Sequence, residues 1–147
     1  MKNVDGLIKN CEKAIKEGWK YVFGAKGQVC TREDIEKFQQ HWGKNNVWDS
    51  DFEKAGQICC DCSGLISSYT GIIRNSTNYK ESATQIEKIE DRKPEMRGWG
   101  VWMKGHIGVY DGNDGYYAMD GSDANAVHKK LDGRGFTHII KLCDITY

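Results

Sequence analysis

Apolar residues recur at three- and four-residue intervals in the first part of the chain, before Gly18. The positions are Val4, Leu7, Ile8, Cys11, Ala14 and Ile15. On an α-helix this spacing brings the side chains to one face, so it predicts an amphipathic helix that ends near Gly18. The segment 21–27, YVFGAKG, predicts a short extended stretch broken at glycines, where the backbone could approach another group and line a cleft.

A second helix is predicted to begin after Thr31 and to end at Gly43. Thr31 and Asp34 have the spacing of a capping box. The apolar positions that follow at helical intervals are Ile35, Phe38 and Trp42. Residues 44–60 show no clear period, and we expect a loop there.

A third helix is predicted after Asp61. Its apolar positions are Leu65, Ile66, Tyr69 and Ile72, with Gly71 near the end. The sequence DCSG at 61–64 supplies cap-type side chains before this run, which places Cys62 in the first turn. Ser82 and Gln85 repeat the spacing of a capping box, so a shorter helix is expected over 82–89.

The pattern changes after Pro94 to short runs rich in Val, Ile, Tyr, Trp and Phe, separated by Gly, Asn and Asp. The runs are GVWM, HIGVY, YYAMD, AVHKKL and FTHIIKL. Such runs predict strands joined by hairpins. Helices first and strands second indicate an α+β fold with an antiparallel sheet.

Composition limits the function classes. The chain has 147 residues, 39% hydrophobic and 29% charged, which predicts one globular domain over 1–147. Lys and Arg balance Asp and Glu at 21 each, so nucleic acid is not expected as a partner. The N-terminus has neither the apolar core of a signal peptide nor the length of a membrane span, so we expect cytoplasmic synthesis and no membrane insertion.

Six cysteines occupy positions 11, 30, 59, 60, 62 and 143. Without an export signal, reduced thiols are expected rather than disulfides. Cys59, Cys60 and Cys62 lie close together, and His41 and Cys143 could join them, so a metal-binding module is one alternative. Because the paired C-x-x-C spacing of structural zinc sites is missing, we expect no metal and no other cofactor.

Cys62 is the candidate nucleophile. At a helix start, free N–H groups and the helix dipole favour the thiolate, which is the form that attacks carbonyls. Ser63 and Gly64 are small and leave room for a substrate backbone. The alternative is that Cys62 is a small buried apolar residue, as many cysteines are.

His106 is the candidate base. In the strand 106–110, His106 shares with Tyr110 the face opposite Ile107, and we expect this face to be accessible. If Tyr110 pairs with Tyr116 across the turn, regular pairing sets His106 opposite Asp120, with Cβ atoms roughly 5 Å apart. Asp120 would then orient the imidazole of a triad. Two alternatives remain: a bulge would present Met119 instead, and His128 is the second choice for the orienting residue.

These motifs resemble those of a known family. DCSGL at 61–65 and GHIGVYDG at 105–112 are similar to the cysteine and histidine motifs of the NlpC-type cell-wall cysteine peptidases, a papain-like family. The stretches GWKYVFGAKGQ, VWMKGHIGVY and GRGFTHIIK are similar to the branch found in phage and prophage lysins of low-GC Gram-positive bacteria. The resemblance covers nearly the whole chain.

The resemblance implies a papain-like fold in which the cysteine helix packs on an antiparallel sheet that carries the histidine and a third polar residue. That third position falls on Asp120, where the family usually has His, Asn, Gln or Glu. The preceding loop is also longer by about two residues, a change that preserves strand parity.

Four further residues are expected to bind substrate. The resemblance implies that Tyr21 contributes to the substrate pocket and the oxyanion region, and that Asp61 and Ser63 bind the amino end of the substrate. Trp102 is a candidate for the cleft wall. Each aromatic could instead belong to the core, and Asp61 could only cap its helix.

The function implied by the resemblance is peptidoglycan endopeptidase activity. The expected partner is the stem peptide, cleaved between γ-D-glutamate and the following diamino acid through an acyl-enzyme, by a monomer that acts on the wall after release from the cell. An excised domain of a secreted protein is an alternative. A papain-like amidase, acyltransferase or transglutaminase on another amide remains a further alternative.

Overall fold

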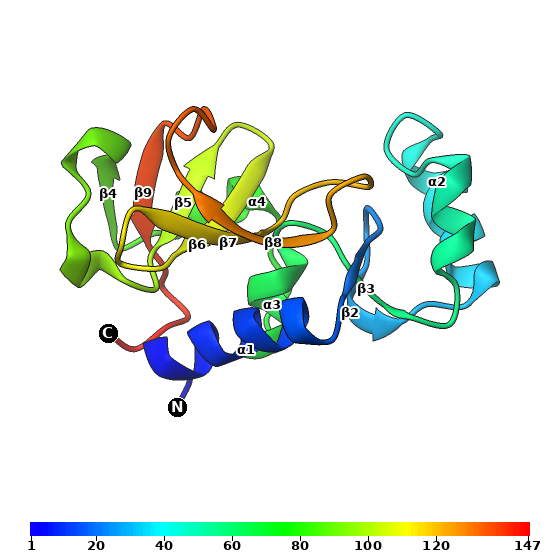
Figure 1. The fold of residues 1–147 in the computed structure, drawn as a ribbon, viewed down its shortest axis with the longest axis horizontal. Helices are drawn as coiled ribbons and strands as arrows, with labels where there is room; N and C mark the ends of the chain where they lie inside the picture. Colours follow the sequence, from blue (N-terminus) through cyan, green and yellow to red (C-terminus); the bar gives the residue numbers. More distant parts are fainter.

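The C-terminal half of the chain folds as a six-stranded antiparallel sheet in this computed structural model, which describes residues 1–147 (Figure 1). The strands are β4 (Gln85–Lys88), β5 (Gly100–Met103), β6 (His106–Tyr110), β7 (Gly115–Met119), β8 (Ala126–Lys130) and β9 (His138–Lys141). Their order in the sheet is β4-β9-β5-β6-β7-β8. The five strands predicted after Pro94 are therefore confirmed, as is the α+β class.

The N-terminal half is mainly helical and carries a small second sheet. Its elements are α1 (Val4–Lys16), β1 (Lys20–Tyr21), β2 (Lys26–Val29), α2 (Arg32–Trp42), the 3-10 helix η1 (Asp49–Lys54) and β3 (Ile58–Cys60). β3 lies between β1 and β2. The capping box at Thr31 and Asp34 is present. The stretch 44–60, expected to be a loop, instead contains η1 and β3, because backbone pairing with β1 and β2 orders it.

Four short helices connect the two halves and the sheet strands. They are α3 (Gly64–Thr70), α4 (Ser76–Glu81) and the 3-10 helices η2 (Ile89–Asp91) and η3 (Pro94–Met96). The prediction of a helix over 82–89 is wrong. The capping box is made by Asn75 and Asn78, so the helix starts earlier, and Gln85–Lys88 pairs with β9 at the edge of the sheet.

The large sheet is covered on both faces. Ile107 and Val109 point to the face on which α1 and α3 pack, with Leu7, Leu65 and Ile66 in the same apolar cluster. On the opposite face, Tyr110 and Tyr116 belong to a second cluster that includes Trp99, Leu131 and Phe136. The face that carries His106, which we expected to be accessible, is thus largely buried. On β6, only His106, the first residue of the strand, stays partly exposed to solvent.

α2 lies apart from the large sheet, at the other end of the molecule from β4 (Figure 1). A third, smaller cluster holds it: Val22, Ala25, Cys30, Ile35, Val47 and Cys59. The longest helix, α1, has 13 residues. No helix has the length together with the apolar character that crossing a membrane requires.

Candidate active site

Cys62 lies in the turn that joins β3 to α3. The neighbouring Asp61 holds this turn, since its N–H donates to the carbonyl of Ala25 at 2.8 Å and its Oδ1 accepts from the N–H of Gly64 at 2.8 Å. Because Asp61 caps the first helical N–H from three residues away, α3 begins at Gly64. The prediction that Cys62 sits in the first helical turn is therefore wrong by two residues.

His106 and Asp120 face each other across the β6–β7 hairpin. Tyr110 pairs with Tyr116, and regular pairing from there brings His106 Nε2 to 2.9 Å from Asp120 Oδ1. The predicted register is confirmed, and the alternative with Met119 is excluded because that side chain is buried in the apolar cluster under α1 and α3. The catalytic roles of these residues stay predictions.

The imidazole of His106 lies close enough to Cys62 for the thiol to influence its pKa. Burial lowers the pKa of His106, but hydrogen bonds to Asp120 and to Cys62 outweigh it and raise that pKa to about 9. Since Nε2 faces Asp120, Nδ1 is the nitrogen left for the thiol. Phe136 stacks on the ring, with centroids 5.7 Å apart, and fixes its plane.

Asp120 is held ionised at this position. Burial raises the pKa of the Asp120 carboxyl, yet hydrogen bonds from His106 and from the Tyr116 hydroxyl, the latter at 3.0 Å, lower it below its ordinary value. Tyr116 and Asp120 are four residues apart on β7 and its continuation, so they share a face. The alternation of side chains along a strand could therefore have identified Tyr116, from the sequence alone, as the second partner of Asp120.

Tyr21 lies near Cys62. Burial and then the negative charge of the Cys62 thiolate raise the pKa of its hydroxyl far above the usual range, so the hydroxyl keeps its proton. The hydroxyl has no hydrogen-bond partner in the chain, although the main-chain groups of Tyr21 do: its N–H donates to Asn125 Oδ1 at 2.9 Å and its C=O accepts from Lys54 Nζ at 2.7 Å. The backbone N–H of Cys62 is also free.

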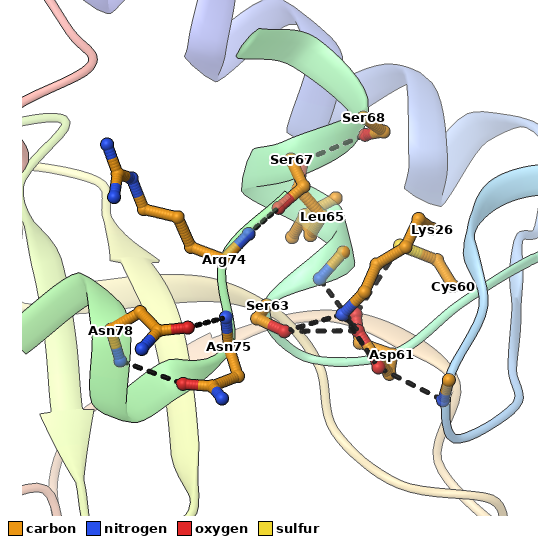
Figure 2. A network of polar contacts seen from close by, with 12 residues as sticks. Lys26, Cys60, Asp61, Ser63, Leu65, Ser67, Ser68, Arg74, Asn75 and Asn78 are labelled. Carbon is orange, nitrogen blue, oxygen red and sulfur yellow. Dashed lines mark hydrogen bonds and ion pairs between the residues drawn. The ribbon is translucent and has the colours of Figure 1, made fainter. Parts of the chain in front are cut away.

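A polar network surrounds Asp61 and Ser63, the neighbours of Cys62 in the chain (Figure 2). Lys26 Nζ donates to Asp61 Oδ1 at 2.9 Å, to Asp61 Oδ2 at 3.0 Å and to Ser63 Oγ at 2.9 Å. The N–H of Gly24 donates to Asp61 Oδ2 at 3.0 Å. Asp61, expected to bind a substrate amine, is therefore engaged by the chain's own ammonium group and by two backbone N–H groups. Nothing in the local sequence signals this partnership with Lys26.

Cys62 opens into a cleft of about 480 Å³. The cleft is lined by Phe23, Gly24, Lys26, Trp42, Asn46, Asp61, Cys62, Ser63, Asn75, Ser76, Thr77 and Gly105. It thus brings together Cys62 with the predicted Asp61 and Ser63. Trp102 does not line this cleft, because its ring lies in an adjoining groove between α4 and the β5–β6 turn.

The remaining histidines and cysteines do not join the site. His128 Nε2 lies 2.7 Å from Asp111 Oδ2, so it is not a partner of His106. Cys59 belongs to the cluster under α2, whereas Cys60 and Cys62 belong to the cluster under α3. The cysteine-rich stretch therefore does not converge, and no group of three or more His, Cys, Asp or Glu residues could hold a metal ion. The alternative of a metal-binding module has no structural support.

No family model matches the sequence, and no curated protein is similar to it in sequence. Solved structures are similar in fold. The peptidoglycan hydrolase RipB from Mycobacterium tuberculosis superposes with a TM-score of 0.63 and 20% identity over 98% of this chain, which spans 65% of that chain. The P60 domain of an antigen from M. avium subspecies paratuberculosis gives a TM-score of 0.63 and 19% identity, over 98% of this chain and 96% of that one. The protein therefore has the papain-like fold of these cell-wall hydrolase and P60 domains, as its cysteine and histidine motifs predict.

Proposed function

We propose that the protein is a cysteine hydrolase of bacterial peptidoglycan that cleaves the stem peptide. The observation that supports this most directly is the 2.9 Å contact between His106 and Asp120 close to Cys62, whose side chain lines an open cleft. Nucleophile, base and orienting residue in this arrangement are the requirements of acyl transfer. The likeness in fold to a peptidoglycan hydrolase favours the wall peptide over other amides.

The proposed reaction proceeds through a thioester. The Cys62 thiolate attacks the scissile carbonyl carbon, and the oxyanion that forms accepts hydrogen bonds from the N–H of Cys62 and the hydroxyl of Tyr21, both of which lack partners in the free protein. The C–N bond then breaks as the His106 imidazolium gives its proton to the departing amine. A water molecule, deprotonated by the neutral imidazole, attacks the thioester and releases the acid and the Cys62 thiolate.

We propose the bond between γ-D-glutamate and the diamino acid as the target. The cleft has aromatic walls in Phe23 and Trp42, and its one buried carboxylate is neutralised by Lys26, so it suits a short peptide better than a polyanion. The place of action that follows is the cell wall. The amino end of the substrate need not bind Asp61, whose oxygens are already engaged.

Digestion of purified peptidoglycan tests the proposal. We expect fragments that end in D-glutamate or D-isoglutamine, new free amino groups on the diamino acid, and no turnover by Cys62→Ala, which should keep the fold. Iodoacetamide should label Cys62, which lines the cleft, faster than Cys59 and Cys60, which are fully buried.

Three outcomes would contradict the assignment. Free reducing sugars would indicate a glycosidase, and intact stem peptides released from lactyl groups would indicate an amidase. Incorporation of added amines in preference to water would indicate an acyltransferase that uses the same thioester.

A further inference from the structure

A second groove of about 500 Å³ adjoins the cleft that contains Cys62. It is lined by Thr77, Lys80, Glu81, Ile86, Trp102 and Lys104. Thr77 lines both cavities, and Lys104 immediately precedes Gly105, which lines the cleft. A ligand that leaves the cleft past Gly105 therefore enters this groove.

The indole of Trp102 forms a fixed wall of the groove. Its Nε1–H donates to the carbonyl of Ser76 at 2.9 Å, and His138 packs edge-on with ring centroids 5.9 Å apart. Lys80 Nζ lies 4.2 Å from the centre of the ring, a cation–π contact that holds the ammonium at the groove. A rigid aromatic wall with a positioned cation is suited to a ligand that combines hydrocarbon and negative charge.

Two lysines of the groove have no acidic partner. Neither Lys80 nor Lys104 takes part in any ion pair of the chain, although Glu81 lines the same groove. With one carboxylate against two ammonium groups, the groove carries a net positive charge. It differs in this from the cleft, where Lys26 and Asp61 neutralise each other.

The chemistry of the proposed reaction sets the direction of the substrate. His106 must give its proton to the departing amine, so the amine side of the scissile bond lies on the His106 side of Cys62. The β5–β6 turn, Lys104 and Gly105, leads directly from His106 to the groove. The acyl side then extends the other way, along Lys26 and Trp42.

We infer that this groove is the subsite for the amine side of the substrate and that it recognises a free carboxylate there, paired with Lys80 and Lys104. Ile86 and Trp102 contact the hydrocarbon next to that carboxylate. The inference rests on the proposed hydrolase function and adds to it a requirement for peptides with an acidic group beyond the cleaved bond.

Two synthetic peptides test this requirement, identical except that the group on the amine side is a carboxylate or a carboxamide. We expect the wild-type protein to favour the carboxylate by about fivefold to tenfold in kcat/KM, as one or two partly exposed ion pairs would give. The variant Lys80→Gln/Lys104→Gln should lose this preference, so that its kcat/KM values for the two peptides become equal. Lys16→Gln, an exposed and unpaired lysine on α1, is the matched control and should keep the preference.

Equal wild-type rates for both peptides, or a preference that survives in the double variant, would overturn the inference while leaving the hydrolase function intact. Failure to cleave either peptide or peptidoglycan would instead count against the proposed function. In that case the binding of the two peptides to Cys62→Ala, measured by calorimetry, tests the groove. Tighter binding of the carboxylate peptide, lost when Lys80→Gln/Lys104→Gln is added to Cys62→Ala, supports the inference. Equal affinities for the two peptides refute it.

Discussion

At the scale of single residues, the polar groups around Cys62 are satisfied from within the chain. The carboxylate of Asp61 accepts hydrogen bonds from three groups, those of Gly24, Lys26 and Gly64. No buried side-chain nitrogen or oxygen of the protein lacks a hydrogen-bond partner. Two donors at the site have no partner in the chain: the backbone N–H of Cys62, and the hydroxyl of Tyr21, a residue that is only partly buried. Donors without partners beside a nucleophile are available to an oxyanion at no cost in broken hydrogen bonds.

The first residue-scale prediction concerns the charge of Asp120. Because its hydrogen bond helps to raise the pKa of His106 to about 9, the imidazolium persists up to that pH, and kcat/KM should fall only as pH rises through about 9. Asp120→Asn removes the negative charge, so the pKa of His106 should drop towards the ordinary value of about 6.5 and the basic limb should move down with it. The measurement is the pH profile of kcat/KM.

Tyr116→Phe is the matched control for this experiment. It removes the other hydrogen bond to Asp120 and leaves the carboxylate in place, so the basic limb should shift much less. A limb that stays near pH 9 in Asp120→Asn would show that Asp120 does not set the charge of His106.

At the scale of elements, the hairpin could be predicted and the turn before α3 could not. Strand parity fixes which side chains share a face, so one correct pair, Tyr110 with Tyr116, suffices to place His106 beside Asp120. The start of α3 depends instead on Asp61, which receives its partners Gly24 and Lys26 from a segment about 35 residues earlier. Capping patterns read locally cannot include such long-range bonds.

The edge strand β4 was missed for a related reason. Gln85–Lys88 is mostly exposed and carries no apolar alternation, so only its backbone pairing with β9 makes it a strand. Trp102 shows the same limit in the site. Its position on β5 was predicted, but the hydrogen bond to Ser76 that turns its ring away from the cleft follows from where α4 packs.

The element-scale prediction concerns an ion pair that joins three segments. Lys54 Nζ lies 2.6 Å from Asp51 Oδ1, which is fully buried, and it also donates to the carbonyls of Tyr21 and Ser122. The pair therefore holds the segment after Asp120 against β1 beside Cys62. Lys54→Met leaves a buried charge alone, and we expect the free energy of unfolding to fall by about 3–5 kcal/mol, measured by urea denaturation.

A second variant separates stability from positioning. Lys54→Met/Asp51→Asn removes both charges and should recover much of the stability. Its kcat should nevertheless be lower than that of the wild-type protein, because the carbonyls of Tyr21 and Ser122 still lack their donor. A double variant with wild-type kcat would show that the pair stabilises the fold only and does not position the site.

At the scale of the whole molecule, the two walls of the cleft differ in how firmly they are held. α3 and β6 belong to the largest apolar cluster, which also includes α1 and the centre of the sheet. α2 buries only Ile35 and is held by the small cluster at the far end of the molecule (Figure 1). Trp42, at the end of α2, nevertheless lines the cleft. The wall that carries Cys62 thus rests on a large apolar cluster, and the opposite wall rests on little buried surface.

Native-state hydrogen exchange should resolve this difference. Elements with few buried apolar contacts open at lower free energy than the core, so the amides of α2 should exchange through a local opening and those of β6 and β7 only through global unfolding. Ile35→Ala should lower the opening free energy of α2 by about 2–5 kcal/mol and leave the strand amides unchanged, provided that opening stays local. Ile107→Ala, in the main cluster, is the matched control and should lower protection throughout the chain. Equal losses at α2 and at β6 in Ile35→Ala would mean that the molecule opens as one unit, with no separate motion of the Trp42 wall.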